Sequence, residues 1–239
     1  MSADNKIVQS LWIGNHLSVM ELLCINSYIK NGHEFHLYVY DRQISIPQYA
    51  VLYDANEIIP EENIFLDSRG SVASFADWFR YKLLYEKGGW WVDMDTVCLK
   101  PFAFEKAYCF AQEEVGSLSI INIGYIKSPM RADYLEDCLN SINEYPSKAG
   151  IAWGTFGLSL IREVLSLYDF EPYLQKPAVF CPIPYYQLDK LINDISPIIS
   201  EEAYAVHLWN EMWRLNDLNK DGVYSRHSLY EWLKDLYLH

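Results

Sequence analysis

The segment GGWWVDMDTVCLKPF, residues 88–102, leads an apolar, strand-forming run into two aspartates and then reaches a proline. In a strand, residues i and i+2 face the same side and lie about 6.6 Å apart along the chain. Asp93 and Asp95 are spaced in this way, so the pattern places two like charges close together. Such a pair is costly unless a positive group lies beside it. The candidates are a divalent cation, a basic side chain and plain solvent.

The helix expected just upstream, residues 74–87, carries a second set of charges. Asp77 and Arg80 are three positions apart among Phe, Trp, Tyr and Leu side chains, so they share one helix face. A buried ion pair that only orders the core is the simpler interpretation. However, buried charges are expensive unless they are fully satisfied. A charged pair next to the Asp93–Asp95 pair therefore favours a functional site.

Outward from this region, strand-like and helix-like segments alternate, with no repeat and no low-complexity linker. The alternation predicts an α/β sheet of mainly parallel strands. Ligands of such sheets bind beyond the carboxyl ends of the strands, where Asp93 and Asp95 would lie. The expected strands are 6–14, 34–41, 90–95, 107–113, 119–127, 178–184 and 203–209, and the expected helices are 18–30, 74–87, 130–142, 156–168 and 228–239.

The composition of the 239 residues narrows the function. A net charge of −13 and a pI near 4.8 argue against a nucleic-acid surface, so a phosphate ligand would need a metal, backbone N–H groups or a few placed basic residues. The five cysteines are scattered and odd in number, which predicts reduced core thiols in a cytosolic protein. The pattern predicts neither a signal peptide nor a transmembrane helix.

Residues 76–101 closely resemble the signature of the DXD-motif sugar transferases (glycosyltransferase family 32). That family includes Och-type mannosyltransferases, bacterial capsular and lipopolysaccharide glycosyltransferases, and relatives of the glucosylating toxin catalytic domains. Its pattern is a Ser/Ala-Asp-x-x-Arg-Tyr helix, then Gly-Gly-aromatic, an apolar residue, Asp-x-Asp and Lys-Pro. This chain reads ADWFRY at 76–81, GGWWVDMD at 88–95 and KP at 100–101.

The resemblance implies a fold and a reaction. The fold is α/β of the GT-A type, a Rossmann-like mixed sheet flanked by helices, in a single domain over residues 1–239. Residues 1–130 would form its nucleotide-sugar and metal-binding half, and residues 131–239 its acceptor-side half with a C-terminal helix. The reaction is a metal-dependent, retaining transfer of a hexose or N-acetylhexosamine from a nucleotide sugar, with UDP preferred and GDP open. The acceptor would be an oligosaccharide or lipid-linked saccharide in cell-surface polysaccharide or lipopolysaccharide synthesis.

The resemblance also assigns roles to particular residues. Asp95 and His207 would hold Mn²⁺ or Mg²⁺, and Asp93 would be a further ligand or a ribose contact. Hard oxygen ligands suit either ion. Asp77 and Arg80 would contact donor-sugar hydroxyls, with Arg80 also near the diphosphate. The implied catalytic set is Asp77, Arg80, Asp93 and Asp95. The implied donor-binding set is Trp12, Ile13, Gly14, Asp77, Arg80, Trp91, Asp93, Asn122 and Trp213.

Weaker similarity supports the outlying members of these sets. Residues 11–14 resemble the first family strand, whose tryptophan stacks on the base, and residues 121–129 a segment whose asparagine faces the donor sugar. Residues 205–213 resemble the closing segment near the metal and diphosphate. Residues 153–157, WGTFG, lack the proline of the family's Thr-Gly-Pro loop, which weakens any inference about the acceptor. The ordinary alternatives are core aromatics for Trp12 and Trp91, a core histidine for His207 and a turn for Asn122.

Two other classes stay open beside the transferase. A nucleotidyltransferase could use a similar acidic pair, but it would be expected to carry a Gly-rich basic loop near its first strand, and LWIGNHLS at 11–18 is no such loop. A non-catalytic nucleotide-sugar-binding module would bind donor without turnover. Residues 217–228 begin like a calcium-binding loop, but Ser228 stands where a bidentate Glu is needed, so a turn is expected there.

The C-terminal helix expected at 228–239 has an apolar stripe with helical spacing. Its members are Leu229, Trp232, Leu233, Leu236 and Tyr237. We expect this stripe to pack on the core. Docking on a membrane or a partner is the alternative, but the polar face is poor in Lys and Arg. The sequence therefore predicts a cytoplasmic enzyme with at most transient, peripheral contact at the inner membrane face.

Overall fold

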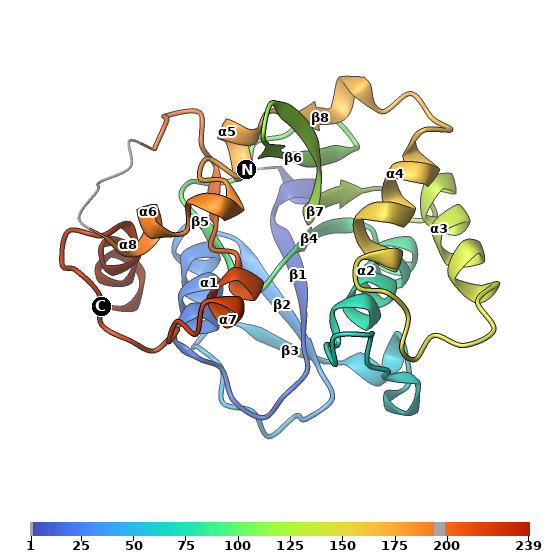
Figure 1. The fold of residues 1–239 in the computed structure, drawn as a ribbon, viewed down its shortest axis with the longest axis horizontal. Coiled ribbons are helices and arrows are strands. Elements are labelled where there is room, and N and C mark those ends of the chain that lie inside the picture. Colours follow the sequence, from blue (N-terminus) through green and yellow to red (C-terminus); the bar gives the residue numbers. More distant parts are fainter. Residues whose placement is uncertain (1, 194–198) are drawn as a thin grey trace.

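The computed structural model describes residues 2–193 and 199–239 and is built around a seven-stranded sheet (Figure 1). The strand order is β3-β2-β1-β4-β7-β6-β8. The strands are β1 (Ile7–Trp12), β2 (Glu34–Val39), β3 (Val51–Asp54), β4 (Gly89–Val92), β6 (Cys109–Val115), β7 (Leu118–Ser128) and β8 (Leu174–Gln175). The pairs β3–β2, β2–β1, β1–β4 and β6–β8 are parallel, and the pairs β4–β7 and β7–β6 are antiparallel. The predicted α/β class, a Rossmann-like mixed sheet flanked by helices, is confirmed.

Helices cover both faces of the sheet (Figure 1). The α-helices are α1 (Val19–Lys30), α2 (Ala73–Lys87), α3 (Asp133–Asn143), α4 (Leu160–Leu165), α5 (Pro177–Phe180), α6 (Asp189–Ile192), α7 (Asn210–Leu215) and α8 (Leu229–Leu238). Shorter helical turns are η1 (Ala3–Asn5), η2 (Ala55–Glu57), η3 (Glu61–Asn63), η4 (Thr155–Ser159), η5 (Glu171–Tyr173) and η6 (Tyr185–Gln187). In Figure 1, α2, α3 and α4 lie to the right of the strands, and α1, α6 and α8 lie to the left.

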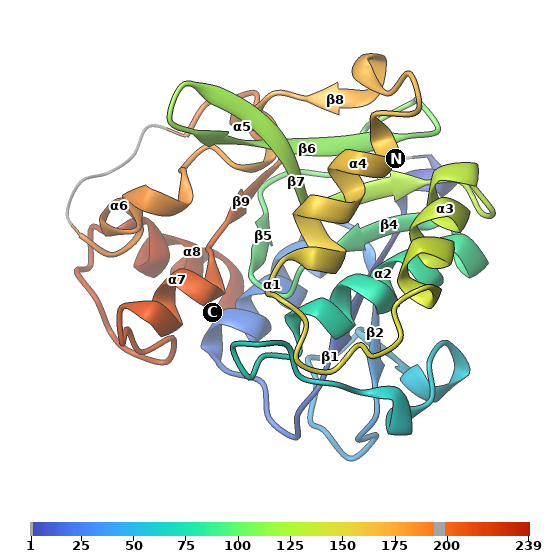
Figure 2. The same ribbon diagram turned by 45° about the vertical axis from the view of Figure 1, so that its right-hand side comes forward.

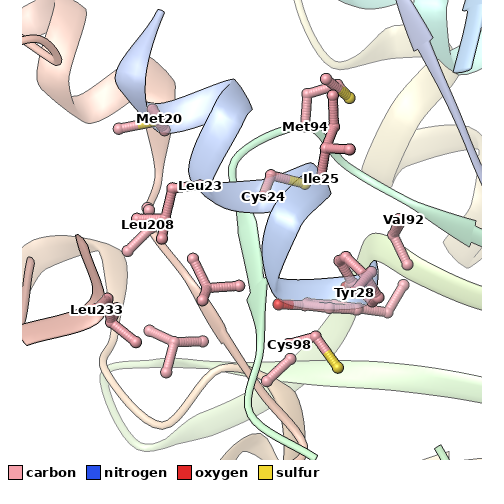
Figure 3. Packing of buried hydrophobic residues seen from close by; sticks show 14 of the residues in the cluster. Met20, Leu23, Cys24, Ile25, Tyr28, Val92, Met94, Cys98, Leu208 and Leu233 are labelled. Atoms are coloured by element: carbon pink, nitrogen blue, oxygen red, sulfur yellow. The ribbon is translucent and has the colours of Figure 1, made fainter. Parts of the chain in front are cut away.

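The alternation of side chains along each strand divides the core in two. In β4, Trp90 and Val92 belong to the cluster beneath α1, whereas Trp91 between them belongs to the cluster beneath α2 and α3. Figure 3 shows part of the first cluster, in which Cys24 and Tyr28 of α1 pack together with Val92 and Cys98. All five cysteines are free and buried, as the sequence predicts. The DXD segment leaves the sheet between these two clusters.

A second, two-stranded sheet connects the DXD segment to the C-terminal part of the chain (Figure 2). Strand β5 (Thr96–Cys98) follows Asp95 directly and pairs antiparallel with β9 (Ala205–His207). The register places Thr96 opposite His207. Helix α7 begins three residues after β9, so this small sheet brings the segment from His207 onward against the two aspartates.

Several predicted elements need correction. The strand predicted at 178–184 is wrong, because Pro177 starts the short helix α5 and Pro182 and Pro184 lack the N–H groups that a strand needs. The helix predicted at 156–168 is broken: Gly157 has non-helical backbone angles inside η4, and α4 begins only at Leu160. The strand predicted at 90–95 ends at Val92, so the two aspartates lie on a turn.

The C-terminal helix α8 packs against α1, which confirms the expected core packing. Leu229, Leu233 and Tyr237 are buried, together with Tyr230, which the predicted stripe did not include. Trp232 and Leu236 belong to the stripe but remain 50% and 44% exposed. Within the described parts of the chain, no helix has the length and apolar character that a membrane crossing needs. The division into two functional halves and the transient membrane contact stay predictions.

Candidate active site

A cavity of about 810 Å³ opens beyond the carboxyl ends of β1 and β4. This is the edge of an α/β sheet at which ligands commonly bind. Its walls come from the end of β1, the α2 helix, the DXD turn, the middle of β7 and the segment that follows β9. Five charged or titratable side chains form what we call the floor of the cavity: Asp77, Arg80, Asp93, Asp95 and His207.

Arg80 joins the two acidic elements of the floor. Its Nη1 donates to Asp77 Oδ1 at 2.9 Å, and its Nη2 donates to Asp93 Oδ1 at 2.7 Å. Trp91 Nε1 donates to the same Asp93 oxygen at 2.7 Å, and the guanidinium lies 4.9 Å from the Trp91 ring centroid. Arg80 Nε is buried and has no hydrogen-bond partner among the described residues. Arg80 lines the cavity, so its guanidinium places a positive charge beside the two carboxylates.

Asp95 is held from the other side of the cavity. Its Oδ1 lies 3.2 Å from His207 Nε2, and its Oδ2 accepts the backbone N–H of Asn210, the first residue of α7, at 2.7 Å. Burial opposes the charge on both side chains. The mutual attraction outweighs that burial, so the pKa of His207 lies well above its ordinary value and the pKa of Asp95 lies below it.

The chemistry of the floor fits a divalent cation. Asp93, Asp95 and His207 each offer one ligand atom, and these atoms lie within 4.8 Å of one another. Two carboxylates and an imidazole suit Mn²⁺, and the oxygen atoms suit Mg²⁺. The absence of a side chain at Gly124 keeps the space beside them open. A Cβ there would lie 3.1 Å from His207 Cε1 and 3.2 Å from Asp93 Oδ2.

Asp77 occupies the most enclosed corner of the floor. Burial raises the pKa of Asp77 to about 6 although Arg80 lies beside it. A Cβ on Gly157 would lie only 2.7 Å from Asp77 Oδ2, so glycine is the residue that this corner accommodates. The break in the helix at η4 thus coincides with a close approach of the Gly157 backbone to the Asp77 carboxylate.

Asn122 links the floor to a carboxylate that the sequence reasoning did not single out. Its Oδ1 accepts the backbone N–H of Gly124 at 2.9 Å, and its Nδ2 donates to Glu113 Oε1 at 3.1 Å. The same Nδ2 lies 3.5 Å from His207 Nδ1. Burial raises the pKa of Glu113, which also lines the cavity. Nothing in the order of residues marks Glu113, because its approach depends on the β6–β7 pairing.

The structure brings most of the predicted donor-binding residues to this cavity. Trp12, Ile13, Trp91 and Asn122 line it, together with the floor. Gly14 is exposed just outside the lining residues. Trp213, a residue of α7, is fully buried and donates from Nε1 to the Leu208 carbonyl at 2.7 Å. Its indole supports the segment that holds Asp95 and is not part of the cavity wall.

Four residues that shape the cavity were missed by the sequence analysis, because none of them forms a side-chain pattern along the chain. Gly124, Gly157 and Asn210 act through the backbone, and Glu113 acts through a neighbouring strand. For Gly124 the sequence offered one signal, its position two residues after Asn122, a predicted donor-binding residue. Backbone roles otherwise leave no side-chain pattern to read.

Residues 18–116 match the family described as "Glycosyltransferase sugar-binding region containing DXD motif". The resemblance read from the signature is thereby confirmed. The matched residues include four of the five floor residues, among them the acidic pair for which that region is named.

Two curated relatives are similar over part of the chain. Lactosylceramide 4-alpha-galactosyltransferase of Mus musculus is 26% identical over 151 residues, which cover 57% of this chain and 40% of that protein. The enzyme of the same name from Pongo pygmaeus is 24% identical over 151 residues, covering 57% of this chain and 66% of that protein. The match thus spans less than two thirds of the length of either relative.

Solved structures show looser similarity. PaToxG Glycosyltransferase has a TM-score of 0.48 at 14% identity and covers 97% of this chain and 87% of its own. The apo-form glycosyltransferase GlyE of Streptococcus pneumoniae TIGR4 has a TM-score of 0.45 at 11% identity, covering 98% of this chain and 64% of its own.

Proposed function

We propose that this chain transfers a hexose or N-acetylhexosamine from a nucleotide sugar to a saccharide acceptor, with retention at the anomeric carbon and with bound Mn²⁺ or Mg²⁺. The observation that carries the proposal is the floor. It places three candidate metal ligands beside a buried arginine, at the sheet edge where ligands bind. UDP is preferred over GDP as the donor nucleotide, a preference that rests on the family resemblance.

In the proposed reaction, the bond between the anomeric carbon and the diphosphate oxygen breaks, and the acceptor hydroxyl forms the new glycosidic bond and passes its proton to the departing diphosphate. The nucleoside diphosphate leaves. A cation held by Asp93, Asp95 and His207 would neutralise the charge on that leaving group. Arg80, whose guanidinium is fixed by Asp77 and Asp93, would place its positive charge near the donor diphosphate.

The base end of the donor would lie on Trp12. This indole is partly exposed and lines the cavity, and its Nε1 donates to the His16 carbonyl at 2.9 Å. That bond fixes the ring and leaves a face for stacking. An anionic donor can bind this acidic chain because the cation and Arg80 supply the positive charge locally.

The acceptor would be an oligosaccharide or lipid-linked saccharide used in cell-surface polysaccharide or lipopolysaccharide synthesis. The two similar proteins are named as galactosyltransferases that act on lactosylceramide, so UDP-galactose and a lactoside are suitable first probes.

The test is donor turnover. UDP-galactose, UDP-glucose, UDP-N-acetylglucosamine and GDP-mannose are each incubated with the protein and Mn²⁺, and release of UDP or GDP is measured with and without saccharide acceptors. We expect metal-dependent release that stops in excess EDTA. Donor binding in a thermal-shift assay without any turnover would instead favour the non-catalytic module, and release of pyrophosphate from a nucleoside triphosphate would favour a nucleotidyltransferase.

A further inference from the structure

The opening of the cavity is built from three side chains that the proposed donor site does not use. We call Arg69, Trp153 and Glu211 the rim; all three line the cavity. Trp153 is 44% exposed, a large fraction for a tryptophan beside a functional cavity. The Arg69 guanidinium carbon lies 4.3 Å from the Trp153 ring centroid, and Arg69 Nη1 lies 3.7 Å from Glu211 Oε1.

The backbone beneath Arg69 and Trp153 is fixed. Asp67 is buried, and its Oδ1 accepts the backbone N–H groups of Arg69 at 2.8 Å and Ser71 at 3.1 Å. The loop that carries Trp153 is joined to this turn by two backbone hydrogen bonds. Ser68 N–H donates to the Ile151 carbonyl at 2.8 Å, and Gly150 N–H donates to the Leu66 carbonyl at 2.8 Å. The backbone is therefore tied to this turn two and three residues before Trp153.

Glu211 connects the rim to the floor. It directly follows Asn210, whose N–H holds Asp95. Arg214 donates to both Glu211 oxygens, at 2.7 and 2.8 Å. These hydrogen bonds lower the pKa of Glu211, so the carboxylate stays ionised. The rim thus begins one residue away from the backbone donor that holds a candidate metal ligand.

The charges of the rim indicate what it can bind. Arg69 and Arg214 are both placed against the Glu211 carboxylate. A second carboxylate, Asp67, accepts the backbone N–H of Arg69 and acts electrostatically on Arg214, so two acidic groups balance the two arginines. A diphosphate would be repelled by Glu211, whereas the hydroxyl groups of a neutral sugar can donate to the carboxylate and accept from Arg69. The exposed indole adds apolar surface, which matches the C–H face of a pyranose ring.

We propose that the rim is the acceptor subsite, in which Trp153 stacks on the terminal sugar of a neutral saccharide while Arg69 and Glu211 hydrogen-bond its hydroxyls. This inference rests on the proposed glycosyl transfer and adds to it the residues that choose the acceptor. The rim and the floor line one cavity, so a sugar on Trp153 shares a continuous space with the donor site.

The experiment compares Trp153→Ala with Trp153→Phe and with a matched control, Trp232→Ala. Trp232 is also an exposed tryptophan, at 50%, but it lies on α8 and does not line the cavity. UDP-galactose, UDP-glucose and UDP-N-acetylglucosamine are the donors, with Mn²⁺, and the acceptors are octyl glycosides of galactose, glucose, N-acetylglucosamine and lactose. Hydrolysis of each donor by water is recorded beside transfer to each acceptor.

We expect Trp153→Ala to raise KM for the acceptor about tenfold or more, while KM for the donor stays close to the wild-type value. Trp153→Phe keeps an aromatic face and should recover much of the loss. The control should behave like the wild type in both assays. A purely structural role for Trp153 would not separate the two KM values, since a distorted cavity impairs donor and acceptor together.

The contrary outcomes are distinct. A wild-type protein that hydrolyses donor but transfers to none of the four glycosides would overturn the acceptor subsite and leave the donor site standing. Equal losses of hydrolysis and transfer in Trp153→Ala would assign Trp153 to the donor site instead. A wild-type protein without metal-dependent hydrolysis of any donor would remove the proposed function, and the rim proposal with it.

Discussion

The floor and the rim share one cavity but are built in opposite ways. The floor side chains range from 5% to 25% exposed, and Arg80 and Asp93 each make two short charged or polar contacts within it. Arg69 and Glu211 of the rim are 46% and 29% exposed, and their ion pair is 3.7 Å long. Buried charges must be fully satisfied to be tolerated, whereas exposed pairs contribute little and can rearrange.

The two regions suit the different requirements of the proposed donor and acceptor. A site that stabilises charge on a leaving group works best when its dipoles and charges are fixed beforehand. A site that accepts one saccharide among many gains from aromatic surface and adjustable hydrogen bonds. We therefore expect changes at the floor to lower donor hydrolysis and sugar transfer together, and changes at the rim to alter only the choice and affinity of the acceptor.

The largest effect should follow Asp95→Asn at the floor. The substitution removes a negative charge from the candidate metal site but keeps the size of the side chain, so hydrolysis and transfer should both fall at least about a thousandfold. Circular dichroism should show an unchanged fold. Asp235→Asn, on the exposed side of α8, is the matched control. Near wild-type turnover by Asp95→Asn, or by the wild type in excess EDTA, would refute the metal assignment.

Arg80→Lys tests whether the geometry of the floor matters as well as its charge. A lysine keeps the positive charge, but one ammonium cannot reproduce the planar donors that reach Asp77 and Asp93 together. We expect kcat/KM for the donor to fall about a hundredfold. If kcat/KM for the best donor were unchanged, Arg80 would return to a structural role and the contrast between floor and rim would weaken.

Gly124→Ala tests the floor by crowding alone. The new Cβ would lie 2.9 Å from Asn122 Oδ1 and 3.1 Å from His207 Cε1, so metal-dependent turnover should fall about tenfold or more. Gly116→Ala is the control. That residue has φ +63° with open space around it, so alanine there costs about 1 kcal/mol of stability and should leave turnover intact. Full activity in Gly124→Ala would show that this space is not needed.

His33 provides the smallest expected effect on activity, because it lies outside both floor and rim. It is 5% exposed, and its Nε2 accepts the Phe102 N–H at 3.2 Å while Nδ1 lies 2.9 Å from the Asn5 carbonyl. Burial lowers the pKa of His33 to about 4. The folded state therefore binds fewer protons than the unfolded state, in which the pKa is near 6.5.

The stability that His33 contributes should be fully present above pH 6.5 and lost as the pH falls toward 4. The expected loss is about 3 kcal/mol in the free energy of unfolding. Urea unfolding at pH 7, 6, 5 and 4 measures it, and His33→Gln should show a flatter dependence over this range. Parallel curves for the two proteins would contradict the assignment. Donor turnover of the variant at pH 7 should match the wild type.

Much of the fold followed from the order of residues because it depends on local patterns. The helix predicted at 18–30 is confirmed as α1, which begins with a local cap in which Glu21 accepts the Ser18 N–H at 2.7 Å. The run before Asp93 predicted β4, and Gly88 predicted the end of α2. The failures were short elements, such as β8 with two residues, whose pairing depends on a distant strand.

The sequence by itself determined three features: the acidic motif, the Asp77–Arg80 pair on one helix face, and the alternation of strands and helices that makes an α/β sheet. Each of them depends on residues that are close together in the sequence. Only the tertiary structure decided that His207 reaches Asp95 through the β5–β9 pair, and that Arg69, Trp153 and Glu211 meet at the opening of the cavity. Those contacts join segments far apart along the chain. They form because the packing of two hydrophobic clusters and the register of the sheet set the positions of distant segments together. No local periodicity in the sequence encodes those positions.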